Sequence, residues 1–202
     1  METPLFPMFL DLSGRHCLVV GAGPEAARRV ALLDRCGARV AVCARLADAP
    51  PLEDMALVMA ADTPLADAEA LAQACEQRGI PVNVADAPQF CTFIMPAIVD
   101  RAPVTVAIST GGRSPMLAAL LRECLDRHLP LELGALASLA ARFRNRVRCA
   151  VADPTARRQF WRRVLTGRIA ALVLGGREPE AEAALGRMLA DAAGQAQERD
   201  AA

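Results

Sequence analysis

The first 85 residues alternate between short apolar runs and segments in which apolar positions recur at helical spacing. The continuous apolar runs predict strands of the kind buried on both faces of a parallel sheet, over 16–21, 38–44, 55–61 and 80–85. Helical spacing extends over 27–36 and 67–78, and Gly37 and Gly79 follow these segments as helix-ending glycines. The alternation indicates βαβ units, so we expect an α/β fold with a Rossmann-like parallel sheet.

After Asp86 the pattern changes to a hairpin followed by helices. Strands are predicted over 93–99 and 104–109, on either side of an Asp-Arg-Ala-Pro turn. Ser114 and Pro115 suit the N-cap and first turn of a helix over 116–128. The rest of the chain predicts an all-helical C-terminal domain, with helices over 133–147, 154–165, 168–174 and 179–193.

Composition excludes several kinds of chemistry. The 202-residue chain is 53% hydrophobic and 23% charged, which is typical of a globular protein. All 23 basic residues are arginines, so neither a Schiff-base lysine nor a phosphate-loop lysine exists. The formal net charge is zero, which gives no electrostatic support for binding nucleic acid or a membrane surface.

The cysteines and histidines favour a reduced compartment and no resident metal. The seven cysteines are odd in number, form no CxxC pair and mostly lie in apolar runs, which favours buried thiols over disulfides or a zinc site. His16 and His128, the two histidines, are far apart in the sequence. Residues 1–10 do not resemble a signal peptide, and every apolar run is shorter than the roughly 18 residues of a membrane span. We therefore expect a cytoplasmic protein that does not associate with a membrane.

A glycine-rich turn joins the first predicted strand to the first predicted helix. Gly21-Ala22-Gly23-Pro24-Glu25-Ala26 matches the GxGxxG/A pattern of dinucleotide-binding turns. Gly21 would allow the tight turn, and Gly23 would let the backbone approach a pyrophosphate at the helix N-terminus. A turn without a ligand stays the alternative, because Pro24 removes one N–H donor. Arg45 follows the second strand where an acid would bind the ribose, so NADP stays open beside NAD.

Several longer motifs follow one another in an order that resembles a known family. They are LFPMFLDL at 5–12, NVADAP at 83–88, FIMPAIVDR at 93–101, ISTGGRSP at 108–115 and RRQFW at 157–161. Together with the glycine loop, they resemble the precorrin-2 dehydrogenase/sirohydrochlorin ferrochelatase family, which forms the N-terminal module of siroheme synthases. The resemblance covers nearly the whole chain.

The resemblance implies an oxidoreductase that oxidises precorrin-2 to sirohydrochlorin with NAD in siroheme biosynthesis. In many members a lyase step follows, in which ferrous iron enters to give siroheme. It also implies a homodimer with three parts: a Rossmann-like NAD-binding domain over 1–89, a dimerisation segment over 90–147 and a helical C-terminal domain over 148–202. The chain shows no methyltransferase module, so we expect it not to make precorrin-2 itself.

The same resemblance implies the site residues. The family's catalytic aspartate falls on Asp86, and Thr110 falls on a hydroxyl residue near the tetrapyrrole. The other substrate-binding residues are Gly111, Gly112, Arg113 and Ser114, and those around the cofactor are Gly21, Ala22, Gly23, Pro24, Glu25, Cys43, Ala61 and Asp62. No resident metal is implied, although the Asp86 carboxylate could coordinate iron transiently.

The chemistry of the substrate agrees with these positions. Asp86 follows a predicted strand at its carboxyl end, where open α/β sheets bind ligands, and a carboxylate can accept a proton during oxidation or metal insertion. The substrate carries eight carboxylates, which arginines bind well. Eight arginines lie at 142, 144, 146, 148, 157, 158, 162 and 163, although a solvated helix face or a dimer salt bridge is an equally open role for each.

One departure from the family shortens the nucleotide half. Only residues 45–54 separate the second and third strands, where the family has another strand and helix, so we expect a sheet shortened by one strand. The family's two acids after the third strand are reduced to Asp62-Thr63. Two alternatives therefore stay open: a chelatase-only protein with a decayed nucleotide site, and a non-catalytic tetrapyrrole-binding scaffold.

Overall fold

The structure is a computed structural model that describes the backbone of residues 5–200 and the side chains of residues 5–194. The chain forms two units. The first contains the chain up to Pro96 together with Ser109–Pro115, and the second contains Ala97–Ile108 and the chain from Met116 onward. The division into 1–89, 90–147 and 148–202 stays a prediction, because a dimerisation segment is defined by contacts with a partner subunit.

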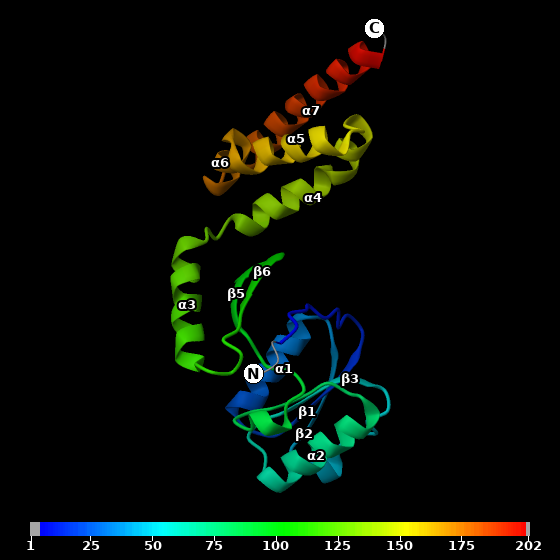
Figure 1. Ribbon diagram of the computed structural model, residues 1–202, viewed down its shortest axis with the longest axis vertical. Coiled ribbons are helices and arrows are strands. Elements are labelled where there is room, and N and C mark those ends of the chain that lie inside the picture. The colour runs from blue at the N-terminus through cyan, green and yellow to red at the C-terminus, as the bar shows by residue number, and fades with distance from the viewer. Residues whose placement is uncertain (1–4, 201–202) are drawn as a thin grey trace. The chain divides into compact units, whose positions relative to one another are not determined.

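A four-stranded parallel sheet forms the centre of the first unit (Figure 1). Its strands lie in the order β2 (Arg39–Cys43), β1 (His16–Val20), β3 (Met55–Ala60) and β4 (Val82–Val84). The expected Rossmann-like α/β fold is confirmed. β2 is an edge strand, and the short 3-10 helix η1 (Leu46–Asp48) is the sole element between β2 and β3, so the sheet is as short as expected.

Alternate side chains of the strands face two helices on opposite sides of the sheet. On one side, Cys17, Val19 and Met59 pack with Ala26 and Leu33 of α1 (Pro24–Arg35). On the other side, the remaining strand positions pack against α2 (Leu65–Arg78) in a core that contains Leu18, Val20, Val58, Leu71 and Cys75. This burial on both faces explains why the strands are continuous apolar runs in the sequence.

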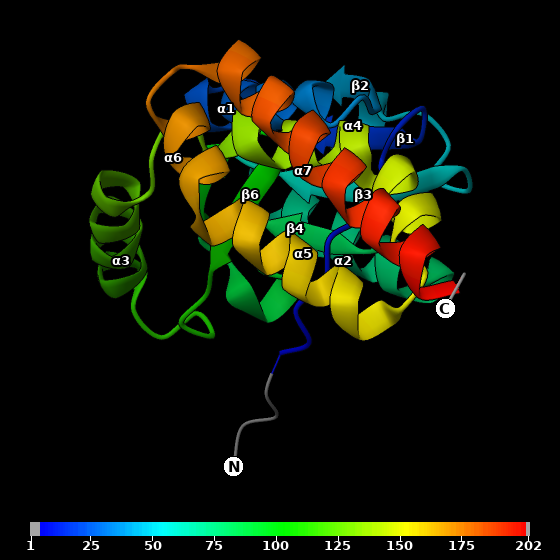
Figure 2. The ribbon, with the colours of Figure 1, turned by 90° about the horizontal axis from the view of Figure 1, so that it is seen from above.

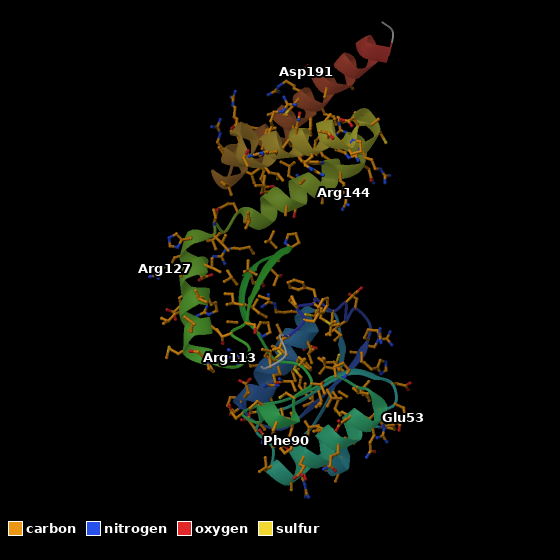
Figure 3. The ribbon with its side chains drawn as sticks, in the orientation of Figure 1. Glu53, Phe90, Arg113, Arg127, Arg144 and Asp191 are labelled. Carbon is orange, nitrogen blue, oxygen red and sulfur yellow. The ribbon has the colours of Figure 1, made fainter. Side chains whose placement is uncertain are left out.

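The segment before the hairpin differs from the expected strand over 93–99. The strand β5 begins only at Ala97 and runs to Arg101, where it pairs antiparallel with β6 (Val104–Ile108). The preceding residues form a loop alongside β4, because Thr92 N–H donates to the Val82 carbonyl and the Asn83 amide donates to the Phe93 carbonyl. The short 3-10 helix η2 (Pro88–Phe90) connects β4 to this loop, and Phe90 packs against the α2 side of the core (Figure 3).

Helices make up the rest of the second unit, as expected. α4 (Leu133–Ala150), α5 (Pro154–Thr166), α6 (Arg168–Leu174) and α7 (Glu178–Asp200) pack together, and α7 contacts both α4 and α6 (Figure 2). Their core contains Leu139, Phe143, Phe160, Val164 and Leu185. α7 extends beyond the predicted end at residue 193.

α3 (Pro115–His128) stands apart from the other helices of this unit in both ribbon views and has no buried residue (Figures 1 and 2). Four of its apolar side chains are exposed: Met116, Leu117, Leu120 and Leu121. Within residues 5–200, no helix combines the length and apolar character needed to cross a bilayer.

Candidate functional site

The carboxyl ends of the parallel strands meet at one edge of the sheet. Gly21 N–H donates to the Cys43 carbonyl at 2.8 Å, and Ala61 N–H donates to the Val20 carbonyl at 3.0 Å. Ala85 N–H continues this row by donating to the Ala60 carbonyl at 2.8 Å. The loops that contain the expected cofactor residues therefore begin side by side, although Gly21 and Asp62 lie 41 positions apart in the chain.

The glycine loop is tight because the next loop passes directly over it. Gly21 has a φ of +138°, and a Cβ there would lie 1.6 Å from the Ala61 carbonyl oxygen. A Cβ on Gly23 would lie 2.3 Å from an Asp62 carboxylate oxygen. Ala26 is buried where α1 meets the sheet. Each small residue of the GxGxxA pattern therefore has a steric reason in this fold.

Asp62 caps helix α1 from the loop that follows the neighbouring strand, β3. Its Oδ2 accepts hydrogen bonds from Glu25 N–H at 2.9 Å and from Ala26 N–H at 3.1 Å. These are N–H groups of the first helical turn, which carry the positive end of the helix dipole. The carboxylate thus occupies the anion-binding position of the βα turn.

Asp86 lies at the equivalent place one strand further along the sheet. Ala60 pairs with Val84, so Asp62 and Asp86 each come two residues after a paired position, and both have positive φ, +54° and +58°. Asp86 is exposed in the turn that follows β4. The expected site residues Asp62 and Asp86 therefore project from neighbouring turns at the same edge.

A thiol holds the turn that contains Asp86. Cys91 Sγ lies 3.2 Å from Val84 N and accepts its hydrogen bond, and it lies 3.3 and 3.4 Å from the carbonyl oxygens of Val84 and Ala87. The sulfur thus contacts backbone groups on both sides of Asp86. Sequence analysis did not single out Cys91.

A buried pair of polar side chains, also missed by sequence analysis, connects the glycine-loop helix to β4. Arg29 Nη1 donates to Asn83 Oδ1 at 2.6 Å, and Arg29 Nε donates to Glu25 at 3.2 Å. Both Arg29 and Asn83 are buried. The available signal was position: Arg29 lies three residues after Ala26 and four before Leu33, on the helix face that packs against the sheet.

Cys43, expected beside the cofactor, ends β2 and is buried. Burial raises the pKa of its thiol, and the negative charge of Asp48 raises it further. The thiol is therefore neutral near pH 7 and can contribute shape to the site but no charge.

The expected substrate-binding residues form a compact loop. The Thr110 hydroxyl accepts a hydrogen bond from Ser114 N–H at 3.2 Å and donates to the Ser114 carbonyl at 3.1 Å. Gly111 and Gly112, between them, have φ of +65° and +76°. This loop, which includes Arg113 (Figure 3), belongs to the same unit as Asp86.

Some of the eight arginines in the second unit are used within it. Arg142 forms an ion pair with Glu182 at 3.0 Å, and Arg157 donates to the Val151 and Ala152 carbonyls. The Arg146 guanidinium lies 4.5 Å from the centre of the Phe143 ring. Arg144 projects from α4 (Figure 3). A role in binding carboxylates stays a prediction for these side chains.

The parallel sheet, its glycine-rich turn and the acidic turns at one edge define a dinucleotide-binding protein of the Rossmann class. Three family models cover the chain in succession: "Putative NAD(P)-binding" over residues 8–97, "Sirohaem biosynthesis protein central" over 101–128 and "Sirohaem synthase dimerisation region" over 132–189. The chain belongs to the family formed by the N-terminal module of siroheme synthases.

Curated relatives agree with this membership. Siroheme synthase of Thiobacillus denitrificans is 44% identical in an alignment of 207 positions, which covers 93% of this chain and 43% of the relative. Siroheme synthase of Methylococcus capsulatus is 44% identical in an alignment of 217 positions, which covers 96% of this chain and 45% of the relative. The chain therefore spans less than half the length of these relatives.

A solved structure of SirC, a precorrin-2 dehydrogenase, has a similar fold. It matches with a TM-score of 0.63 and 18% sequence identity, and the match covers 91% of this chain and all of the SirC chain. At this identity the similarity concerns the fold alone.

Proposed function

We infer that this chain oxidises precorrin-2 to sirohydrochlorin with NAD as the hydride acceptor. The observation that carries the proposal is the juxtaposition at one sheet edge of the glycine-rich turn and the exposed carboxylate of Asp86. The first can hold a dinucleotide and the second can hold a proton. An NAD-dependent oxidation needs both functions within one site, because a hydride and a proton leave the substrate.

The residues fit a dinucleotide. Gly21 and Gly23 keep the turn tight, because a side chain at either position would collide with Ala61 or Asp62. The Glu25 and Ala26 N–H groups of this turn bind an anionic oxygen. NAD, when bound, supplies a nicotinamide ring that accepts a hydride. The proposed residues around it are Gly21, Ala22, Gly23, Pro24, Glu25, Cys43, Ala61 and Asp62.

Asp86 is the proposed general base. The C–H bond that is oxidised breaks with its electron pair, and the tetrapyrrole then loses one proton to the Asp86 carboxylate. The turn geometry keeps this carboxylate at the carboxyl edge, because Cys91 holds the flanking backbone. Thr110 to Ser114 are the proposed contacts for the peripheral carboxylates of the tetrapyrrole.

Ferrous iron insertion by the same chain is a part of this proposal that needs its own assay, with iron as a substrate. A chelatase without dehydrogenase activity is the second candidate. The observation in its favour is that the Asp62 carboxylate binds the N–H groups that a pyrophosphate would need.

Further parts of the proposal are a homodimer, supported by the dimerisation-region match, and a cytoplasmic location, supported by seven free cysteines.

Anaerobic turnover of precorrin-2 with NAD tests the proposal. We expect the Asp86→Asn variant to bind NAD with unchanged affinity and to lose about 100-fold or more in kcat, since general-base catalysis contributes about 10²- to 10⁴-fold. Asp34→Asn is the matched control, because Asp34 is an exposed carboxylate at the far end of α1 and should turn over normally.

Two results would contradict the proposal. Equal turnover by Asp86→Asn and the unmodified chain would remove the base from the mechanism. Iron insertion without any NAD-dependent turnover would favour the chelatase-only candidate.

A further inference from the structure

The first turn of α1 offers few N–H groups to an incoming anion. Pro24 has no N–H, and Ala27 N–H donates to the Gly23 carbonyl at 3.1 Å. Glu25 and Ala26 remain, and the N–H groups of both donate to Asp62 Oδ2. Among the first four residues of the helix, every N–H group therefore already has a partner.

The Asp62 carboxylate also fills the space that Gly23 leaves open. A Cβ on Gly23 would lie within 2.3–2.7 Å of the Oδ2, Cγ and Cβ atoms of Asp62. In the dinucleotide-binding turn, this missing side chain is what allows a pyrophosphate to approach the backbone. Asp62 thus takes both the hydrogen-bond donors and the volume of the expected pyrophosphate position.

The turn that carries Asp62 holds two unfavourable features. Asp62 has a φ of +54°, in a region that non-glycine residues rarely adopt. The neighbouring Thr63 hydroxyl oxygen is buried and, within the described residues, has no hydrogen-bond partner. A buried hydroxyl without a partner is costly, so a rearrangement of the turn can relieve it. Asp62 itself is exposed and therefore has solvent to move into.

We propose that Asp62 is an internal competitor for the cofactor's pyrophosphate: it caps α1 in the free protein and leaves when the dinucleotide binds. The inference rests on the proposed function for the identity of the ligand. Two anions cannot share the same two N–H groups, and the carboxylate would repel a pyrophosphate beside it. Binding of NAD thus requires the Asp62–Thr63 turn to move.

The proposal predicts opposite effects of one substitution on stability and on affinity. Asp62→Asn keeps the shape of the side chain and tolerates a positive φ, but it removes the charge. The free protein loses a charged cap and its Tm falls. The dinucleotide then competes with a neutral amide instead of a carboxylate, so the Kd for NAD falls by about 2- to 5-fold, the factor that corresponds to the usual contribution of one charge at a helix N-terminus.

Calorimetric titration with NAD, and thermal unfolding with and without saturating NAD, test both effects on the full chain. Asp34→Asn serves as the control for removal of one exposed carboxylate from the same unit. We expect Asp62→Asn, but not Asp34→Asn, to bind NAD more tightly than the unmodified chain does. We also expect the Tm difference between Asp62→Asn and the unmodified chain to shrink when NAD is present. Equal or weaker binding of NAD by Asp62→Asn would overturn the proposal while leaving the proposed function intact.

Failure of the proposed function has a different outcome. If neither protein binds NAD at millimolar concentration, inorganic pyrophosphate replaces it as the probe. A larger Tm increase for Asp62→Asn than for the unmodified chain would then support Asp62 as an internal anion. Equal increases, or none, would overturn the proposal in that case as well.

Discussion

The buried contact between Arg29 and Asn83 leads to a prediction about stability that a double-mutant cycle can measure. The Arg29 side chain is 8% exposed and donates to Asn83 Oδ1 at 2.6 Å. Arg29→Met removes the charge and most of the donors while keeping a long apolar stem. Asn83→Leu keeps the volume but removes the acceptor.

Each single substitution leaves a buried polar group without its partner. Arg29→Met leaves Asn83 Oδ1 without a donor, and Asn83→Leu leaves part of the Arg29 guanidinium unpaired. A lost hydrogen bond to a charged group costs about 1.5–3 kcal/mol, so we expect each variant to lose about 2–3 kcal/mol of the free energy of unfolding. The double variant leaves neither group, so its loss should be smaller than the sum by about 1.5–3 kcal/mol.

The coupling is measured by urea unfolding, with hydrogen exchange of the β1 and β3 amides as the signal. Fluorescence would not report on this unit, because Trp161, the single tryptophan, lies in the second unit. Arg28→Met is the control: Arg28 also pairs with Glu25, but its side chain is 79% exposed, so the loss should stay below about 0.5 kcal/mol. A coupling energy below about 0.5 kcal/mol would refute the reasoning, because the two groups would then contribute independently.

Three further predictions concern other parts of the chain. Gly21→Ala should abolish NAD binding and destabilise the first unit, since its Cβ would lie 1.6 Å from the Ala61 carbonyl oxygen. The control is Gly186→Ala in α7, where a Cβ would have no atom within 4 Å, and it should raise the free energy of unfolding in urea by about 0.5–1 kcal/mol. Asp153→Ala should cost about 0.5–2 kcal/mol, measured in the same way, because Asp153 Oδ2 accepts from Ala156 N–H at 2.7 Å as the N-cap of α5. Burial raises the pKa of Cys75 to about 11, so at pH 8 only about one Cys75 thiol in 1,000 is ionised. A thiol reagent at pH 8 should therefore modify the exposed Cys36 far faster than Cys75, and equal rates of modification would contradict this prediction.

The sheet could be predicted from the sequence because burial on both faces leaves an uninterrupted apolar run for each strand. Val19 and Val20, for instance, face opposite sides and are both fully buried. The glycine loop could also be predicted, since a side chain at Gly21 would meet the Ala61 backbone and one at Gly23 would meet the Asp62 side chain.

The contacts within the site could not be predicted in this way. The capping of α1 by Asp62 joins residues 36 and 37 positions apart, and it depends on how two loops meet at the sheet edge. The Arg29–Asn83 contact spans 54 positions, and an arginine in a helix is solvated unless a buried acceptor faces it. Residues 93–96 were predicted as part of a strand because they form an apolar run. In the structure, Phe93 and Met95 pack against the core beside the sheet, and β5 begins only at Ala97.

The central claim is that this chain transfers a hydride from precorrin-2 to NAD. The most direct measurement follows NADH and sirohydrochlorin together by absorbance under anaerobic conditions, with the purified chain, precorrin-2 and NAD. The account predicts that both products accumulate in equal amounts and that omission of NAD stops both. Sirohydrochlorin formed at the rate of the enzyme-free control, with no NADH, would contradict the account.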